Sequence, residues 1–100
     1  MTVMVDELRV WSFARPPFHR GSCHLTTDAD LDELHAFAAR LGLRRRWFQE
    51  HRLAPHYDLT PDLRALALAH GALMVSARQQ ALARRARRVG SSAHLVHRRA

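Results

Sequence analysis

The sequence predicts a small single α/β domain, with about four short strands in a mixed or parallel sheet and three helices. Three observations support this class: short apolar runs alternate with segments of helical periodicity, glycine or proline separates most of them, and the chain has 100 residues. That length suits one domain and is too short for two. Residues 1–89 are expected to form the domain and residues 90–100 a flexible basic tail.

The first strands are predicted from apolar and β-branched residues. Residues 2–5 form one such run, which ends at Asp6, and residues 22–26 form the second. Residues 9–21 contain a Pro-Pro pair and are expected to be irregular. The single cysteine, Cys23, excludes an internal disulfide and is expected to be a buried thiol, with a catalytic thiol beside a histidine as the alternative.

A helix is predicted to follow Asp30, because Asp30 and Glu33 fit a capping box and apolar residues then repeat at helical spacing. Gly42 is suited to end this helix in a left-handed conformation. Residues 47–49 are predicted to form a third strand or an extended segment.

The second half of the chain predicts two more helices and a last strand. Thr60 is expected to cap a helix that has Pro61 at its first position and ends near residue 70. Residues 72–75 are apolar and predict the last strand. Ser76 is then suited to cap an arginine-rich helix over residues 77–89.

The composition excludes disorder and membrane insertion but does not identify a partner. Hydrophobic residues make up 47% of the chain, and no run reaches the roughly 18 apolar residues of a membrane helix. The N-terminus lacks the features of a signal peptide, so a cytoplasmic location is expected. The formal net charge is +7, and all 16 basic residues are arginine, while lysine, isoleucine and asparagine are absent. Because those three residues have AT-rich codons, a GC-rich genome explains the arginine excess as well as a nucleic-acid partner does.

The order of several short blocks carries a family resemblance. These blocks include Cys23-His24-Leu25, Trp47-Phe48-Gln49, Pro55-His56-Tyr57-Asp58 and Gly71-Ala72. Over about residues 1–78 the chain resembles the domain-of-unknown-function 4031 family, small proteins of bacteria and their phages. The resemblance implies no activity, but it implies that the polar positions in these blocks recur among relatives.

Four polar residues are candidates for a catalytic or metal site: Asp6, His24, His56 and Asp58. In an extended segment His56 and Asp58 point to the same side, so they could share a divalent metal or act as an oriented imidazole for proton transfer. Asp58 could instead cap backbone amides before the next helix. Asp6 ends a strand, where open α/β sheets place their ligands, but it could also be a turn residue. His24 could meet Asp6 or His56 if Cys23 faces the core.

Four further residues are candidates for ligand binding: Trp47, Gln49, Tyr57 and Arg64. Trp47 is expected in the core, with a stacking platform for a base as the alternative. Arg64 could pair with Asp58 or bind an anion.

Nucleic acid could be bound through Arg44, Arg45 and Arg46 and through the helix from Arg84 to Arg88. The sequence lacks paired Cys-x-x-Cys motifs, His-Glu-x-x-His and Gly-rich phosphate loops. Three hypotheses therefore remain beside that of an uncharacterised domain with a polar ligand or metal site. They are a metal-dependent hydrolase or nuclease, a basic nucleic-acid-binding accessory domain, and a structural role.

Overall fold

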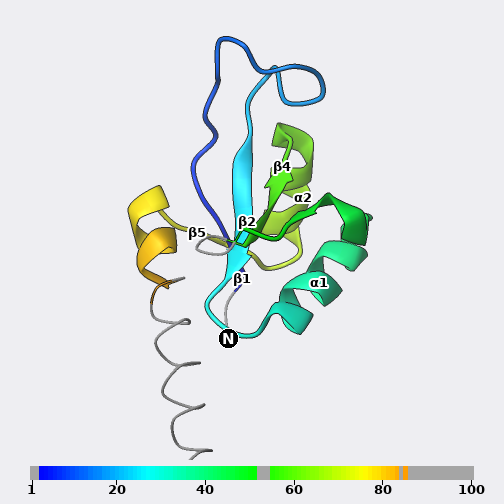
Figure 1. Ribbon diagram of the computed structural model, residues 1–100, viewed down its shortest axis with the longest axis vertical. Helices are drawn as coiled ribbons and strands as arrows, with labels where there is room; N and C mark the ends of the chain where they lie inside the picture. The colour runs from blue at the N-terminus through cyan, green and yellow to red at the C-terminus, as the bar shows by residue number, and fades with distance from the viewer. Residues whose placement is uncertain (1–2, 52–54, 84, 86–100) are drawn as a thin grey trace, which may run out of the picture.

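The centre of the computed structural model, which describes residues 3–51, 55–83 and 85, is a five-stranded mixed sheet (Figure 1). Its strand order is β3-β4-β2-β1-β5, and of the four pairings only that of β1 with β5 is parallel. The α/β class and the mixed sheet are thus confirmed. The strands are β1 (Val3–Val5), β2 (Cys23–Thr27), β3 (Phe48–Gln49), β4 (His56–Leu59) and β5 (Leu73–Met74).

The pairing of β2 with β4 divides their side chains between two faces of the sheet. Cys23 lies opposite Leu59, and His24 lies opposite Asp58. Because successive side chains of a strand point to opposite faces, Cys23 and Leu59 share one face and His24 and Asp58 share the other. The first face is the core, where Cys23 and Leu59 are buried together with Leu34 from the first helix.

Helices α1 (Leu31–Arg40) and α2 (Pro61–Ala69) cover the core face (Figure 1). Both begin at the predicted caps: the Asp30 carboxylate accepts a hydrogen bond from the Glu33 amide at 3.1 Å, and the Thr60 hydroxyl accepts one from the Leu63 amide at 3.2 Å. Gly42 follows the C-cap of α1, Leu41, and its φ of 83° is the predicted left-handed conformation.

A third α-helix is described over residues 77–83 and 85, and it lies on the opposite side of the sheet from α1 and α2 (Figure 1). It begins at the predicted cap, because the Gln79 amide donates to the Ser76 hydroxyl at 3.1 Å and the Ser76 amide donates to the Gln79 side chain at 2.8 Å. Arg84, the predicted end of this helix and the predicted tail over residues 90–100 lie outside the described residues.

Two irregular segments complete the fold. A single 3-10 turn, η1 (Arg45–Trp47), precedes β3, so the predicted strand at residues 47–49 begins one residue later, at Phe48. Residues 6–22 form a long loop above the sheet, whose ends are joined by two 2.9 Å backbone hydrogen bonds between Arg9 and Ser22 (Figure 1). None of the helices in the described part of the chain is long and apolar enough to cross a membrane.

Candidate functional site

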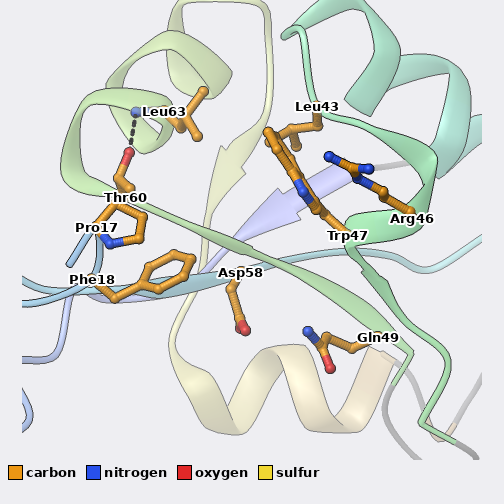
Figure 2. A pocket seen from close by; sticks show the side chains of 9 residues that line it. All are labelled: Pro17, Phe18, Leu43, Arg46, Trp47, Gln49, Asp58, Thr60 and Leu63. Carbon is orange, nitrogen blue, oxygen red and sulfur yellow. Dashed lines mark hydrogen bonds between the residues drawn. The ribbon is translucent and has the colours of Figure 1, made fainter. Parts of the chain in front are cut away.

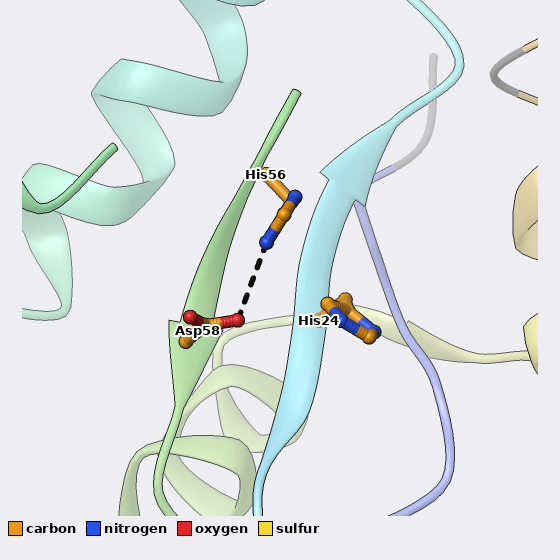
Figure 3. A group of neighbouring side chains, drawn as sticks. All are labelled: His24, His56 and Asp58. Atoms are coloured by element: carbon orange, nitrogen blue, oxygen red, sulfur yellow. Dashed lines mark ion pairs between the residues drawn. The ribbon is translucent and has the colours of Figure 1, made fainter. Parts of the chain in front are cut away.

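Three potential metal ligands lie together on the face of the sheet that is opposite to the core. They are His24 on β2 and His56 and Asp58 on β4 (Figure 3). One nitrogen or carboxylate oxygen from each side chain lies within 4.8 Å of the other two. His56 Nε2 is 3.3 Å from Asp58 Oδ1, and the two imidazole rings meet edge to face at a centroid distance of 4.8 Å.

The backbone explains why these three side chains meet. His56 and Asp58 are two residues apart on β4, so they point to the same face, and His24 is the register partner of Asp58. The prediction that His56 and Asp58 share one side is confirmed. The alternative role of Asp58 as a helix cap is wrong, because Asp58 belongs to the strand and Thr60 caps α2.

Asp6 does not join this cluster directly but holds His24 in place. Its carboxylate, in a residue only 3% exposed, accepts hydrogen bonds from the His24 backbone amide at 2.6 Å and from His24 Nδ1 at 2.8 Å. Burial raises the pKa of Asp6, but the hydrogen bonds and the charge of His24 outweigh it, so the net pKa lies below the ordinary value. An ionised carboxylate can only accept, so Nδ1 of His24 is the donor, and in the neutral tautomer that this bond selects, Nε2 carries the lone pair that a ligand requires.

Two further side chains fix the backbone around this pair. Arg64 Nε donates to the Asp6 carbonyl at 3.0 Å, and Gln80 Nε2 from the C-terminal helix donates to the His24 carbonyl at 2.9 Å. The predicted pairing of Arg64 with Asp58 is therefore replaced by a bond to the Asp6 backbone. Gln80 is only 1% exposed, but nothing in the neighbouring sequence distinguishes it from a surface glutamine, so its role could not be predicted.

A cavity of about 510 Å³ lies beside the cluster, and Asp58 belongs to both (Figure 2). Trp47 and Gln49 line it from η1 and β3, and Phe18 lines it from the long loop. Trp47 is 45% exposed, so the expectation of a core tryptophan is wrong, and its side chain is accessible to a ligand. Phe18 is half-buried. Its place in the cavity wall was not predicted, because the loop that carries it has no regular periodicity.

Tyr57, a predicted binding residue, lies on the core face and is 1% exposed. Its hydroxyl is 2.9 Å from Nδ1 of His35, and its ring packs against Phe48. Burial raises the pKa of Tyr57, and burial together with the charge of Arg45 lowers the pKa of His35. This pair ties α1 to β4 and is separated from the cluster by the sheet.

Cys23 is buried, as predicted, and its thiol faces away from His24. Burial raises the pKa of Cys23 to about 12, with a further contribution from the negative charge of Asp6. Because the thiolate is the reactive form, a thiol with this pKa is a poor nucleophile at neutral pH. The alternative of a catalytic Cys23 and His24 pair is therefore wrong.

The three predicted arginines at η1 are exposed, but they differ in their contacts. The guanidinium of Arg44 lies 5.9 Å from the Trp47 ring centroid, and that of Arg45 lies 5.0 Å from the Phe48 ring centroid. Arg46 lines the cavity. In the predicted basic helix, Arg85 is exposed, while Arg84 and residues 86–88 lie outside the described residues.

The cluster therefore combines two imidazoles and one carboxylate, a donor set found in transition-metal sites. Comparison of the chain with curated proteins and with solved structures gave no match. The sequence model of one family, described as "Protein of unknown function (DUF4031)", matches residues 3–89 and so extends beyond the predicted end of the resemblance near residue 78. The chain belongs to this family.

Proposed function

We propose that this domain binds one divalent transition-metal ion through His24, His56 and Asp58, and that the bound metal is catalytic. The observation that supports the site best is the hydrogen bond between Asp6 and His24 Nδ1. Metal-binding histidines usually donate their second ring N–H to a carboxylate or carbonyl, which fixes the tautomer and the direction of the free nitrogen. A buried carboxylate in this position is costly unless it is paired, and His24 supplies both of its partners.

The spacing of the donors supports the same proposal. Two ligands that each lie about 2.1 Å from one tetrahedral ion are about 3.4 Å apart. His56 Nε2 and Asp58 Oδ1 are 3.3 Å apart, which matches that spacing. The three donor atoms lie within 4.8 Å of one another. The most distant pair must therefore come closer by up to about 1.4 Å when a metal binds, and rotation of an imidazole ring can provide this movement.

Three protein ligands leave at least one coordination position for water or substrate, which distinguishes catalytic from structural zinc sites. The exposure of the side chains, 43% for His24 and 36% for Asp58, keeps that position accessible. A metal in such a site lowers the pKa of its bound water towards neutrality and polarises a carbonyl or phosphoryl oxygen. The reaction class that these features support is metal-dependent hydrolysis, and the cavity beside Asp58 would hold the substrate.

Isothermal titration calorimetry of the metal-free chain with Zn²⁺ and Mn²⁺ tests the site. We expect one ion per chain for at least one of these metals. His56→Ala and Asp58→Asn should each weaken binding at least tenfold, because the first removes a ligand and the second replaces an anionic ligand by a neutral one. His70→Ala is the matched control, since His70 is an exposed histidine at the end of α2 whose ring bonds the Leu66 carbonyl. Equal affinity in wild type and His56→Ala would reject the proposed ligand set.

A further inference from the structure

The cavity beside Asp58 has the size and the lining of a small-molecule site. Ligand pockets commonly have volumes of about 300–1,000 Å³ and mostly apolar walls with a few polar groups. This cavity has a volume of about 510 Å³, and Leu43 and Leu63 contribute to its apolar wall. Its polar groups include the carboxamide of Gln49 and the carboxylate of Asp58.

Two aromatic rings from distant parts of the sequence line this cavity. Figure 2 shows Phe18, on the long loop, and Trp47, on η1, on opposite sides of Asp58. An aromatic side chain packed into a core buries about 150–250 Å² of surface, which stabilises the fold. Trp47 is 45% exposed and so loses much of that stabilisation. Rings placed in this way favour a flat aromatic ligand, which can stack on either of them.

The polar groups that line the cavity suit the edge of a nucleobase. A glutamine carboxamide offers one acceptor oxygen and two donor hydrogens, which is the pattern needed for paired hydrogen bonds with a base. Gln49 is exposed, and it is the register partner of His56, so it lies next to the proposed metal ligands. The Asp58 carboxylate adds an acceptor for an exocyclic amino group.

One cationic side chain, Arg46, lines the cavity. It forms no ion pair with any other residue in the part of the chain that the structure describes. The guanidinium of Arg44 lies 5.9 Å from the Trp47 ring centroid, so a second cation is close to a ring that lines the cavity. A guanidinium of this kind binds a phosphate through paired, charge-assisted hydrogen bonds.

We propose that this cavity binds a nucleoside monophosphate unit, with its base against Trp47 and Phe18 and its phosphate at Arg46. Asp58 belongs to both the cavity and the proposed metal site, so a bound nucleotide would place its phosphate-bearing part near the metal. That this nucleotide is a substrate therefore rests on the proposed function. Binding itself does not require the metal, since the rings, Gln49 and Arg46 are all supplied by the chain.

Calorimetric titration of the chain in EDTA with AMP, GMP, CMP and UMP tests the inference without any metal. We expect saturable binding of at least one of them. Trp47→Leu should weaken it at least about fivefold, because stacking on the ring is lost. Arg46→Gln should weaken binding of the monophosphate about tenfold and leave binding of the corresponding nucleoside unchanged. Arg78→Gln is the matched control, since Arg78 is exposed on the C-terminal helix and outside the cavity.

Two sources could present this ligand, a free nucleotide or the end of a single strand, and the same titration with a single-stranded hexanucleotide distinguishes them. Equal or tighter binding of the hexanucleotide supports a strand, and weaker binding supports a free nucleotide. Absence of binding to every monophosphate at millimolar concentration, or wild-type affinity in both Trp47→Leu and Arg46→Gln, would overturn the inference. Failure of the metal site is a separate result, because His56→Ala should bind Zn²⁺ at least tenfold more weakly and still bind nucleotide in EDTA.

Discussion

Replacing Asp6 by asparagine should perturb the proposed metal site without replacing any of its three proposed ligands. The Asp6 carboxylate accepts from two nitrogens of His24, at 2.6 and 2.8 Å, whereas an amide has only one acceptor oxygen. If its NH₂ group faces Nδ1, His24 must move its proton to Nε2 and lose the lone pair that would bind the metal. If its NH₂ group faces the backbone amide, two donors oppose each other and the ring is displaced.

The expected loss of metal affinity in Asp6→Asn is about 10- to 100-fold, the range for partners that orient metal-binding histidines. The effect on folding should be smaller. Loss of a charge-assisted hydrogen bond costs about 1.5–3 kcal/mol, but removing a carboxylate that is 3% exposed also removes its cost of burial. We therefore expect the free energy of unfolding to fall by less than about 2 kcal/mol.

Calorimetry with Zn²⁺ measures the affinity, and urea unfolding followed by circular dichroism measures the stability. Asp30→Asn is the control, because it removes the same charge from an exposed carboxylate and asparagine caps a helix as well as aspartate does. Its Zn²⁺ affinity should equal that of the wild type. A folded Asp6→Asn variant with wild-type affinity would refute the argument that Asp6 positions His24.

Three other predictions test the fold and the titrating groups. Cys23 in the native chain should not react with Ellman's reagent at pH 8 but should react in urea, because burial raises the pKa of its thiol to about 12; rapid native reaction would show that it is accessible. Leu34→Ala should lower the free energy of unfolding by about 2–5 kcal/mol in urea titrations, because this side chain is fully buried, and a loss below 1 kcal/mol would contradict its place in the core. The lowered pKa of His35 means that its contribution to stability is present above pH 6.5 and is lost as the pH falls through its folded value. The free energy of unfolding should therefore fall less between pH 7 and pH 5 in His35→Gln than in the wild type. Equal falls in the two proteins would count against the burial of this ring.

Local sequence patterns predict the elements of this fold because each depends on residues close in the chain. The caps at Asp30 and Thr60 and the left-handed Gly42 use side chains and dihedral angles within one helical turn, so they could be identified directly. Alternation along an extended segment likewise predicted that His56 and Asp58 share one side.

The register between strands and the contacts of the loops could not be predicted in this way. His24 meets Asp58, 34 positions further along the chain, only because of the register between β2 and β4. A shift of one residue in that register would place a core-facing residue of β4 opposite His24. The hydrogen bond from Gln80 to the His24 carbonyl spans 56 positions. Trp47 is exposed and lies at the end of a 3-10 turn, one residue before the strand to which the sequence pattern assigned it.

Crystallography of the chain grown with Zn²⁺, with data collected at the zinc absorption edge, tests the proposed metal site most directly. We predict one anomalous peak about 2.0–2.2 Å from His24 Nε2, a His56 nitrogen and an Asp58 oxygen, with the hydrogen bond from His24 Nδ1 to the Asp6 carboxylate retained. An anomalous peak at other residues, or none between these three side chains at saturating Zn²⁺, would contradict it.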